Sequence, residues 1–369
     1  MTAPPPEGSG PPDGPAEPDG PAQPDEPAQP DEPAEPDAPA PPEPPQAGWR
    51  PGTSTFTIEG RAAPGLFVVG WLATIVGLGA ILVAFLGGVR GGNPIVLLAG
   101  LVVLSIGLVA GAGGQAIERR ARGGRAYVGP SPFLVFAAAI PISSLLGIAI
   151  GAVLAVLRIP VDGPLAALAS VALQTAVYLG LIRLLVIDSG ALSWTEMRIT
   201  RFSSTAAMEL LLGAAWAFPV IVATLPVAYL ISRFIPTPPP NLLPPTGDPT
   251  GFALNLVAAA VFAPIGEEIL FRGFSLTAWA RDMGVPRGLV RASLFFALAH
   301  ILTISGSTAG DALGQALAAF LGRLPIAFAL GYLFVRRETI WAPLGLHATF
   351  NAILLILQEV AFRNGAPQP

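Results

Sequence analysis

The chain has 369 residues, of which 52% are hydrophobic and only 12% are charged, and its mean hydropathy is +0.63. A soluble domain carries roughly 25% charged residues, so this composition excludes an ordinary soluble enzyme. It indicates a protein that crosses a membrane several times. The chain contains no Cys and no Lys, which excludes disulfides, thiolate metal ligands and lysine-based catalysis. The only histidines are His300 and His347.

The first 48 residues differ in composition from the rest of the chain. They contain 11 acidic residues and no basic residue, and a Pro-rich hexapeptide occurs four times from Pro15 (PAEPDG, PAQPDE, PAQPDE, PAEPDA). Proline fixes φ and removes a backbone donor, and the segment has almost no apolar side chains to bury. We therefore expect residues 1–50 to form a disordered cytoplasmic tail with local polyproline II character. A solvated, repulsive tail and a docking segment for an unknown partner both fit this composition.

Nine apolar runs follow the tail and predict transmembrane helices. A helix needs about 20 residues to cross a hydrocarbon core of about 30 Å, and backbone groups in lipid must be satisfied within the segment. The predicted fold is an all-α, polytopic transmembrane helical bundle of about nine spans, with eight as the alternative count. The runs lie near residues 64–89, 94–116, 131–157, 164–187, 205–235, 252–275, 287–306, 311–336 and 339–362.

Arginine placement predicts the orientation of the bundle. The loops after the second, fourth, sixth and eighth runs are rich in Arg, whereas the intervening loops are poor in it, as in IPTPPPNLLPPTGD from Ile235. Cytoplasmic loops carry the excess of basic residues. We therefore expect the Arg-rich loops and the N-terminus in the cytoplasm, and the C-terminus outside. The expected location is the plasma membrane, in a bacterium the inner or cell membrane.

Three polar clusters fall within the predicted spans. They are GEEILFR from Gly266, FALAH from Phe296 and HATFN from His347, so both histidines of the chain lie at membrane depth. An ionisable residue in a membrane span is costly and indicates a functional site. The alternative for the first cluster is that its span ends at Pro264, which would place both glutamates in a cytoplasmic loop.

Helix geometry separates the two glutamates of the first cluster. Glu268 and Arg272 are four residues apart with the acid first, which is the favourable order for an ion pair. Glu267 is rotated by about 100° and lacks that partner. The spacing therefore predicts a structural role for Glu268 and Arg272, and leaves Glu267 available as a general base.

The other polar residues leave more alternatives open. His347 and Asn351 share a helix face, where they can stabilise an oxyanion or form an interhelical hydrogen bond. His300 can likewise serve only to form an interhelical hydrogen bond. Phe296 is expected to pack against neighbouring side chains. Arg323, a further buried charge, is expected to be structural and to pair with Asp311 or with a carboxylate of the site.

The ordered motifs EExxxR, FxxxH and HxxxN on successive late helices resemble those of the CAAX protease and bacteriocin-processing family (CPBP, also called Abi) of intramembrane endopeptidases. The resemblance covers roughly residues 205–362. It implies a CPBP-like catalytic transmembrane core over residues 205–362, preceded by N-terminal transmembrane helices over residues 51–204. A short C-terminal tail, residues 363–369, would follow.

The family resemblance also implies a mechanism. Glu267 and His300 would hold and activate a water, while His347 and Asn351 would stabilise the tetrahedral oxyanion. The implied activity is hydrolysis of a peptide bond in a membrane-associated protein or peptide, with the lipid bilayer as surroundings and no nucleic-acid partner. By counting along the runs, Glu267 and His347 lie in the cytoplasmic half of the bilayer and His300 at the middle or in the outer half. A tilted or broken helix is therefore expected.

Two rival interpretations remain. In the first, the protease depends on a metal, and Glu267, His300 and His347 hold Zn²⁺. Two His, a carboxylate and a water form a known catalytic zinc set. In the second, the chain is a non-catalytic scaffold or immunity protein of the same fold, and the motifs only hold helices together.

The predicted orientation can be tested with reporters. A reporter fused after Arg122 should score as cytoplasmic and one inserted near Pro240 as external, because the two sites lie on opposite sides of the Arg alternation. Reporter activity in intact and permeabilised cells would measure this. If both sites score on the same side, the number of spans between them is wrong.

Overall fold

The computed structural model describes residues 60–86, 93–235, 243–302 and 308–365. The chain divides into two units, Met1–Pro51 and Gly52–Pro369, and every described residue belongs to the second. Several predictions fall partly or wholly outside the described residues. They concern the tail over residues 1–50, residues 87–89 of the first run, residues 236–242 of the Arg-poor loop, residues 303–306 of the seventh run and residues 366–369 of the C-terminal tail.

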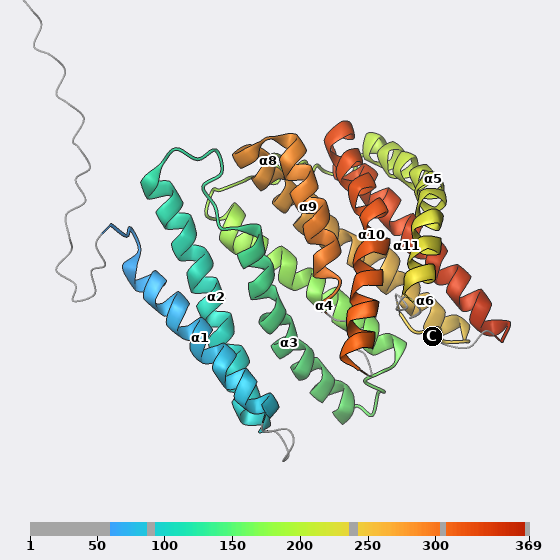
Figure 1. Cartoon of the computed structure of the whole chain (residues 1–369), viewed down its shortest axis with the longest axis horizontal. Helices are drawn as coiled ribbons and strands as arrows, with labels where there is room; N and C mark the ends of the chain where they lie inside the picture. Colours follow the sequence, from blue (N-terminus) through green and yellow to red (C-terminus); the bar gives the residue numbers. More distant parts are fainter. Residues whose placement is uncertain (1–59, 87–92, 236–242, 303–307, 366–369) are drawn as a thin grey trace, which may run out of the picture. The chain divides into compact units, whose positions relative to one another are not determined.

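The described residues form helices and contain no strand (Figure 1), which confirms the predicted all-α fold. Within the described ranges, eight segments are long and apolar enough to cross a membrane. They are α1 (Pro64–Leu86), α2 (Pro94–Arg122), α3 (Pro132–Val156), α4 with the π-helix η2 (Pro164–Ile187), α5 (Ser204–Phe234), a composite sixth segment (Pro249–Met283), α10 (Ala309–Arg337) and α11 (Trp341–Arg363).

The seventh predicted run forms a helix that is too short to span by itself. Helix α9 covers Val285–Ala299, which is 15 residues and about 22 Å. In Figure 1 it descends from the upper end of the bundle and stops partway, whereas α10 starts near the lower end. The predicted counts of nine and eight spans therefore differ by one segment, α9, whose helix covers only part of the distance across the membrane.

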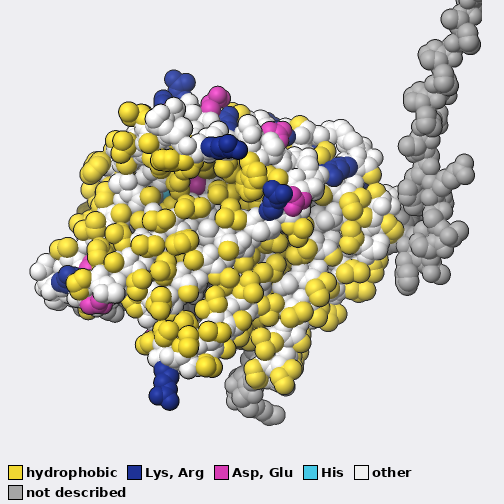
Figure 2. Space-filling view, turned by 180° about the vertical axis from the view of Figure 1, so that it is seen from behind, with side chains coloured by type: hydrophobic (Ala, Val, Ile, Leu, Met, Phe, Trp, Pro, Cys, Tyr) yellow, Lys and Arg dark blue, Asp and Glu magenta, His cyan; other side chains and the backbone are white. Residues whose placement is uncertain are grey.

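The Arg-rich connections lie on one side of the described bundle. Polar contacts join the ends of helices that are far apart in sequence, and Figure 2 shows charged side chains gathered along the upper edge above a mainly hydrophobic surface. This sidedness agrees with the alternation of arginines along the chain. The ion pairs are Arg125 with Asp282 (3.5 Å), Arg281 with Glu196 (2.6 Å), Arg198 with Glu338 (3.4 Å) and Arg337 with Glu209 (2.5 Å).

One of these ion pairs persists into strong acid. The hydrogen bond from Arg281 lowers the pKa of Glu196 from 4.5 to about 2. Because the pKa in the folded state is depressed, the contribution of the pair to stability is present above pH 4.5 and is lost as the pH falls towards 2. Both side chains are well exposed, so water screens this contribution.

Close contact between α5 and α11 depends on two glycines. A Cβ atom at Gly213 would collide with the carbonyl oxygen of Ala342, and one at Gly345 would collide with that of Leu210. Small residues let transmembrane backbones approach in this way. Since Gly345 lies two residues before His347, this contact fixes where α11 presents that imidazole.

Replacing Gly213 by Ala should therefore destabilise the bundle by about 1–3 kcal/mol, because the added methyl group overpacks a backbone contact. Gly147→Ala is the matched control, since nothing lies within 4 Å of a Cβ atom there. The control should be neutral or slightly stabilising, because Ala favours a helix over Gly by about 1 kcal/mol. Thermal melting of the full chain in detergent measures both, and equal melting temperatures would contradict the packing argument.

Candidate active site

The composite sixth segment contains π-helical turns next to its two glutamates. In order it consists of α6 (Pro249–Val257), η3 (Ala258–Phe262), α7 (Ala263–Glu267), η4 (Glu268–Leu276) and α8 (Thr277–Met283). Short π-helical turns within α-helices are rare and frequently occur at functional sites. Here Glu267 ends α7 and Glu268 begins η4.

Side chains from two neighbouring helices hydrogen-bond to carbonyl groups of η3. The Oγ1 atom of Thr175, in α4, donates to the carbonyl oxygen of Phe262 (2.8 Å), and Nδ2 of Asn351, in α11, donates to that of Ala259 (2.8 Å). These bonds give partners to backbone groups inside the apolar bundle. They also commit one amide hydrogen of Asn351 to a structural bond.

Glu268 is the centre of a fully buried polar network. Its side chain is 0% exposed, and Oε1 accepts hydrogen bonds from Nη1 of Arg272 (2.8 Å) and from Nδ1 of His347 (2.7 Å). Arg272 also donates through Nη2 to the carbonyl oxygen of Ala327, in α10 (3.3 Å). The network therefore joins the sixth segment to α10 and α11, and the predicted ion pair of Glu268 with Arg272 is present.

Phe296 packs against the charged and imidazole groups of the cluster. The guanidinium of Arg272 lies 4.2 Å from its ring centroid, and the rings of His300 and His347 lie at centroid distances of 4.5 and 5.8 Å. Its carbonyl oxygen is 2.7 Å from Nδ1 of His300. Phe296 thus holds both imidazoles in position through its ring and its backbone, which extends the packing role expected of it.

Both imidazoles direct Nε2 towards Glu267. The Nε2 atoms of His300 and His347 lie 3.5 and 3.7 Å from Oε2 of Glu267. The structure therefore brings together the three residues that the motifs singled out. The side chains of Glu267 and His300 are 20% and 23% exposed, against 4% for His347, so they are the less buried members of the cluster, although Oε2 of Glu267 itself is buried.

The hydrogen bonds on the opposite ring nitrogens fix the tautomers of the imidazoles. A carbonyl oxygen can only accept, so Nδ1 of His300 carries the hydrogen, and the carboxylate of Glu268 likewise takes the Nδ1 hydrogen of His347. In a neutral ring, Nε2 is then an acceptor. Oε2 of Glu267 is also an acceptor and has no hydrogen-bond partner among the described residues. Three acceptors therefore converge at a point where a water could donate to two of them.

The structure resolves the mismatch in depth between Glu267 and His300. The sixth segment continues as a helix to Met283, eight residues beyond the predicted end at residue 275. Glu267 therefore lies 16 residues before the upper end of its segment, and His300 lies 15 residues after the start of α9. The two residues are at matching depth because the sixth helix extends further than its apolar run.

Arg323 is placed differently from the expectation. It is partly buried in α10, and Nη1 donates to the carbonyl oxygen of Ala319 in its own helix (3.2 Å). No ion pair joins it to a carboxylate of the described residues, so neither predicted pairing is formed at contact distance.

Sequence reasoning missed the contribution of α4. Thr175 bonds to η3, and the hydroxyl of Tyr178 accepts a hydrogen bond from Gln174 (2.9 Å). Three polar residues within five positions of an apolar helix were the available signal. Helix α4 also packs along η3, α7 and η4, so the predicted N-terminal helices contribute directly to the site.

Among the residues that the structure describes, no group of three His, Asp or Glu side chains is arranged to hold a metal ion. The three acceptors formed by Glu267, His300 and His347 are chemically suited to Zn²⁺, but they are arranged around one carboxylate oxygen.

Comparison with known proteins relates the part of the chain that holds this site to a protease family. Residues 249–353 match the model of a family described as Type II CAAX prenyl endopeptidase Rce1-like. The matched segment contains all three motifs, which confirms the resemblance to the CAAX protease family and indicates a protease. Neither the curated proteins nor the solved structures contain a significant match to the chain. With the eight apolar helices, the family match supports a multi-pass membrane protein.

The two adjacent glutamates should differ in their effect on stability. Glu268→Gln removes the charge that Arg272 and His347 share in a fully buried site, and breaking such a pair typically costs about 3–5 kcal/mol. Glu267→Gln replaces an acceptor that faces two other acceptors by an amide that can donate to them. It should melt at or above the temperature of the wild type. Melting of both variants in detergent is the measurement, and a lower melting temperature for Glu267→Gln than for Glu268→Gln would reverse the assignment.

Proposed function

We propose that this protein is an intramembrane endopeptidase that hydrolyses a peptide bond in a membrane-associated protein or peptide. The observation that carries the proposal is the convergence of Oε2 of Glu267 with Nε2 of His300 and Nε2 of His347. The match to a protease family over the same residues supports it. The proposed location is a cell membrane, with the Arg-rich side of the bundle in the cytoplasm.

In the proposed mechanism a water donates to the converging acceptors and attacks the carbonyl carbon of the scissile bond. Glu267 accepts the proton that the water loses, and His300 holds the water in line. The carbon–nitrogen bond then breaks, and the amine leaves with a proton returned from Glu267. The partial exposure of the Glu267 and His300 side chains, compared with fully buried Glu268, fits this division of roles.

His347 and Asn351 are proposed to assist the oxyanion. The hydrogen bond of Nδ1 of His347 to the carboxylate of Glu268 directs Nε2 towards the reacting groups, and Nε2 assists an oxyanion when it carries a hydrogen. Asn351 can contribute only the amide hydrogen that is not bonded to Ala259. Glu268, Arg272 and Phe296 hold these groups in place.

The proposal predicts a loss of cleavage in one glutamate variant and not in another. Membranes from cells that express the wild type, Glu267→Gln or Glu196→Gln would be compared by quantitative mass spectrometry of newly formed peptide termini, which detects cleavage of any protein in the membrane. Glu267→Gln should reduce the wild-type termini by about 10²–10⁴-fold, because general-base catalysis is lost. Glu196→Gln, which alters an ion pair outside the spans, should leave them unchanged.

The same comparison separates the rival interpretations. Full activity in Glu267→Gln would sink the proposed mechanism. Identical termini in cells with and without the wild type would favour a non-catalytic scaffold or immunity protein. For the purified chain, loss of cleavage on chelation and recovery with added Zn²⁺ would assign the mechanism to a metal held by Glu267, His300 and His347.

A further inference from the structure

A groove lies between helices α1 and α2, beside α3, and is separate from the candidate active site. It has a volume of about 320 Å³. Apolar side chains and glycines form most of its lining, among them Phe67, Trp71, Leu108, Gly111 and Leu134. The side chain of Trp71 is 58% exposed, so the groove can be reached from the lipid around the bundle.

The groove has the length of one leaflet of a bilayer. Its lining on α2 runs from Gly107 to Glu118, which is about 16 Å of helix, and half of a hydrocarbon core of about 30 Å is about 15 Å. Beyond Gly107 the two helices close on each other, because a Cβ atom at Gly77 would lie 2.5 Å from the backbone nitrogen of Leu104. The groove therefore suits a lipid chain, whereas a transmembrane helix would need about twice this length.

The end of the groove at the Arg-rich side is polar. Nη1 of Arg61 donates to both carboxylate oxygens of Glu118 (2.8 and 3.0 Å), and Nη2 of Arg122 lies 3.4 Å from one of them. Two guanidinium groups thus share one carboxylate, which gives this end a net positive charge. Oε1 of Gln115 accepts from the backbone nitrogen of Ser131 (2.5 Å), while its Nε2 has no hydrogen-bond partner among the described residues.

We propose that this groove binds one anionic phospholipid from the leaflet on the Arg-rich side. One acyl chain lies along the groove over Gly111, and the phosphate accepts hydrogen bonds from Arg61 and Gln115. Arginine donors suit phosphate oxygens, and basic pockets between transmembrane helices bind anionic headgroups. The inference does not depend on the proposed function, because the groove shares no residue with the candidate active site.

Position 111 allows the groove to be filled without moving the helices. The nearest atom to a Cβ at Gly111 is Cδ2 of Leu134, at 3.9 Å, so Gly111→Leu would place its side chain where the acyl chain lies. Gly113→Leu is the matched control. Gly113 is in the same helix and outside the groove, and nothing lies within 4 Å of a Cβ atom there. Both variants exchange the same residue types, so their effects on helix propensity are alike.

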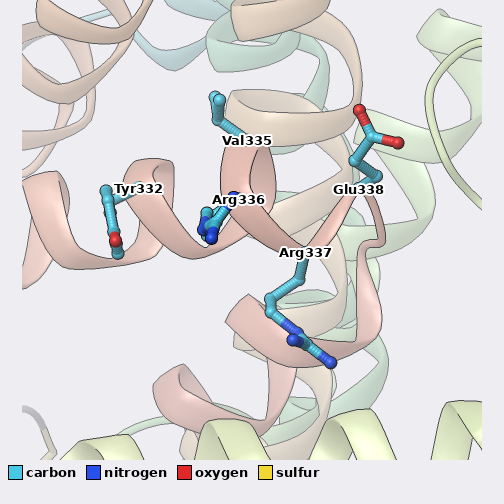
Figure 3. A pocket seen from close by; sticks show the side chains of 5 residues that line it. All are labelled: Tyr332, Val335, Arg336, Arg337 and Glu338. Atoms are coloured by element: carbon cyan, nitrogen blue, oxygen red, sulfur yellow. The ribbon is translucent and has the colours of Figure 1, made fainter.

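A second pair of variants tests the charge. Arg61→Gln removes a guanidinium from the polar end of the groove. Arg336→Gln is its control, because Arg336 is exposed at the Arg-rich end of α10 and lines a different hollow. The other residues of that hollow are Tyr332, Val335, Arg337 and Glu338 (Figure 3). This control measures the general attraction of anionic lipids to the Arg-rich side.

The experiment is a lipid titration of the full chain in detergent micelles, followed by native mass spectrometry, which counts the molecules bound to each chain. The probes are phosphatidylglycerol, phosphatidylcholine with the same acyl chains, and glycerol phosphate, which carries the anionic phosphate without a chain. The proteins are the wild type and the two pairs of variants. Thermal melting checks that each variant is folded, and if one groove variant is not, the other decides.

The wild type should bind one phosphatidylglycerol about tenfold or more tightly than either other probe, because that lipid alone combines a chain with a net negative charge. Gly111→Leu should weaken this binding by about tenfold or more, since a well-filled space does not accept added atoms. Arg61→Gln should weaken binding of phosphatidylglycerol by about tenfold and leave that of phosphatidylcholine within about twofold. Gly113→Leu and Arg336→Gln should match the wild type.

Four results would overturn the inference. Equal affinity of Gly111→Leu and the wild type would show that the chain does not lie in the groove, and equal affinity for the two phospholipids would exclude the anionic headgroup. Tight binding of glycerol phosphate alone would indicate an anion site without a lipid chain. A wild type that is dimeric beside a monomeric Gly111→Leu would assign the groove to a second copy of the chain.

Discussion

A carboxylate and a guanidinium lie four residues apart inside an apolar bundle, and neither has access to solvent. Desolvation makes such a pair expensive unless each partner is hydrogen-bonded further. Glu268 and Arg272 meet this condition by recruiting His347 and the carbonyl group of Ala327. The consequence is that the three helical segments carrying these groups cannot move independently. The position of every other group in the site depends on this arrangement.

The same network determines what His347 can do chemically. Because Glu268 binds Nδ1, the other ring nitrogen faces Glu267, and Phe296 imposes the same orientation on His300 through its carbonyl group. The cluster is therefore rich in lone pairs and poor in donors at its accessible side. A water fits such a site because it donates twice, whereas an anion does not fit unless a donor comes from elsewhere.

Much of the fold and of the candidate site could be predicted from the sequence, whereas the rest depends on contacts between helices. Hydrophobic runs and the spacing of Glu268 and Arg272 are local patterns, so the helical fold and the ion pair could be predicted. The end of α9 at Ala299 could not, since apolar residues continue past it, and the extension of the sixth segment to Met283 could not, since those residues include Arg281 and Asp282 and lie beyond the apolar run. The bond of Asn351 to Ala259 and the participation of α4 arise from tertiary packing, which spacing along one helix does not encode.

The π-helical turn η3, finally, makes the site sensitive to chain length. Each residue of an α-helix advances the chain by about 100° around its axis, so an extra residue within a turn changes the direction in which all later side chains point. Removing one alanine from Ala258–Ala260 would leave the composition of the span almost unchanged and the helix continuous. It would nonetheless turn Glu267 away from the imidazoles or else detach Asn351 and Thr175 from η3. In this segment, the number of residues is under stricter physical constraint than their identity.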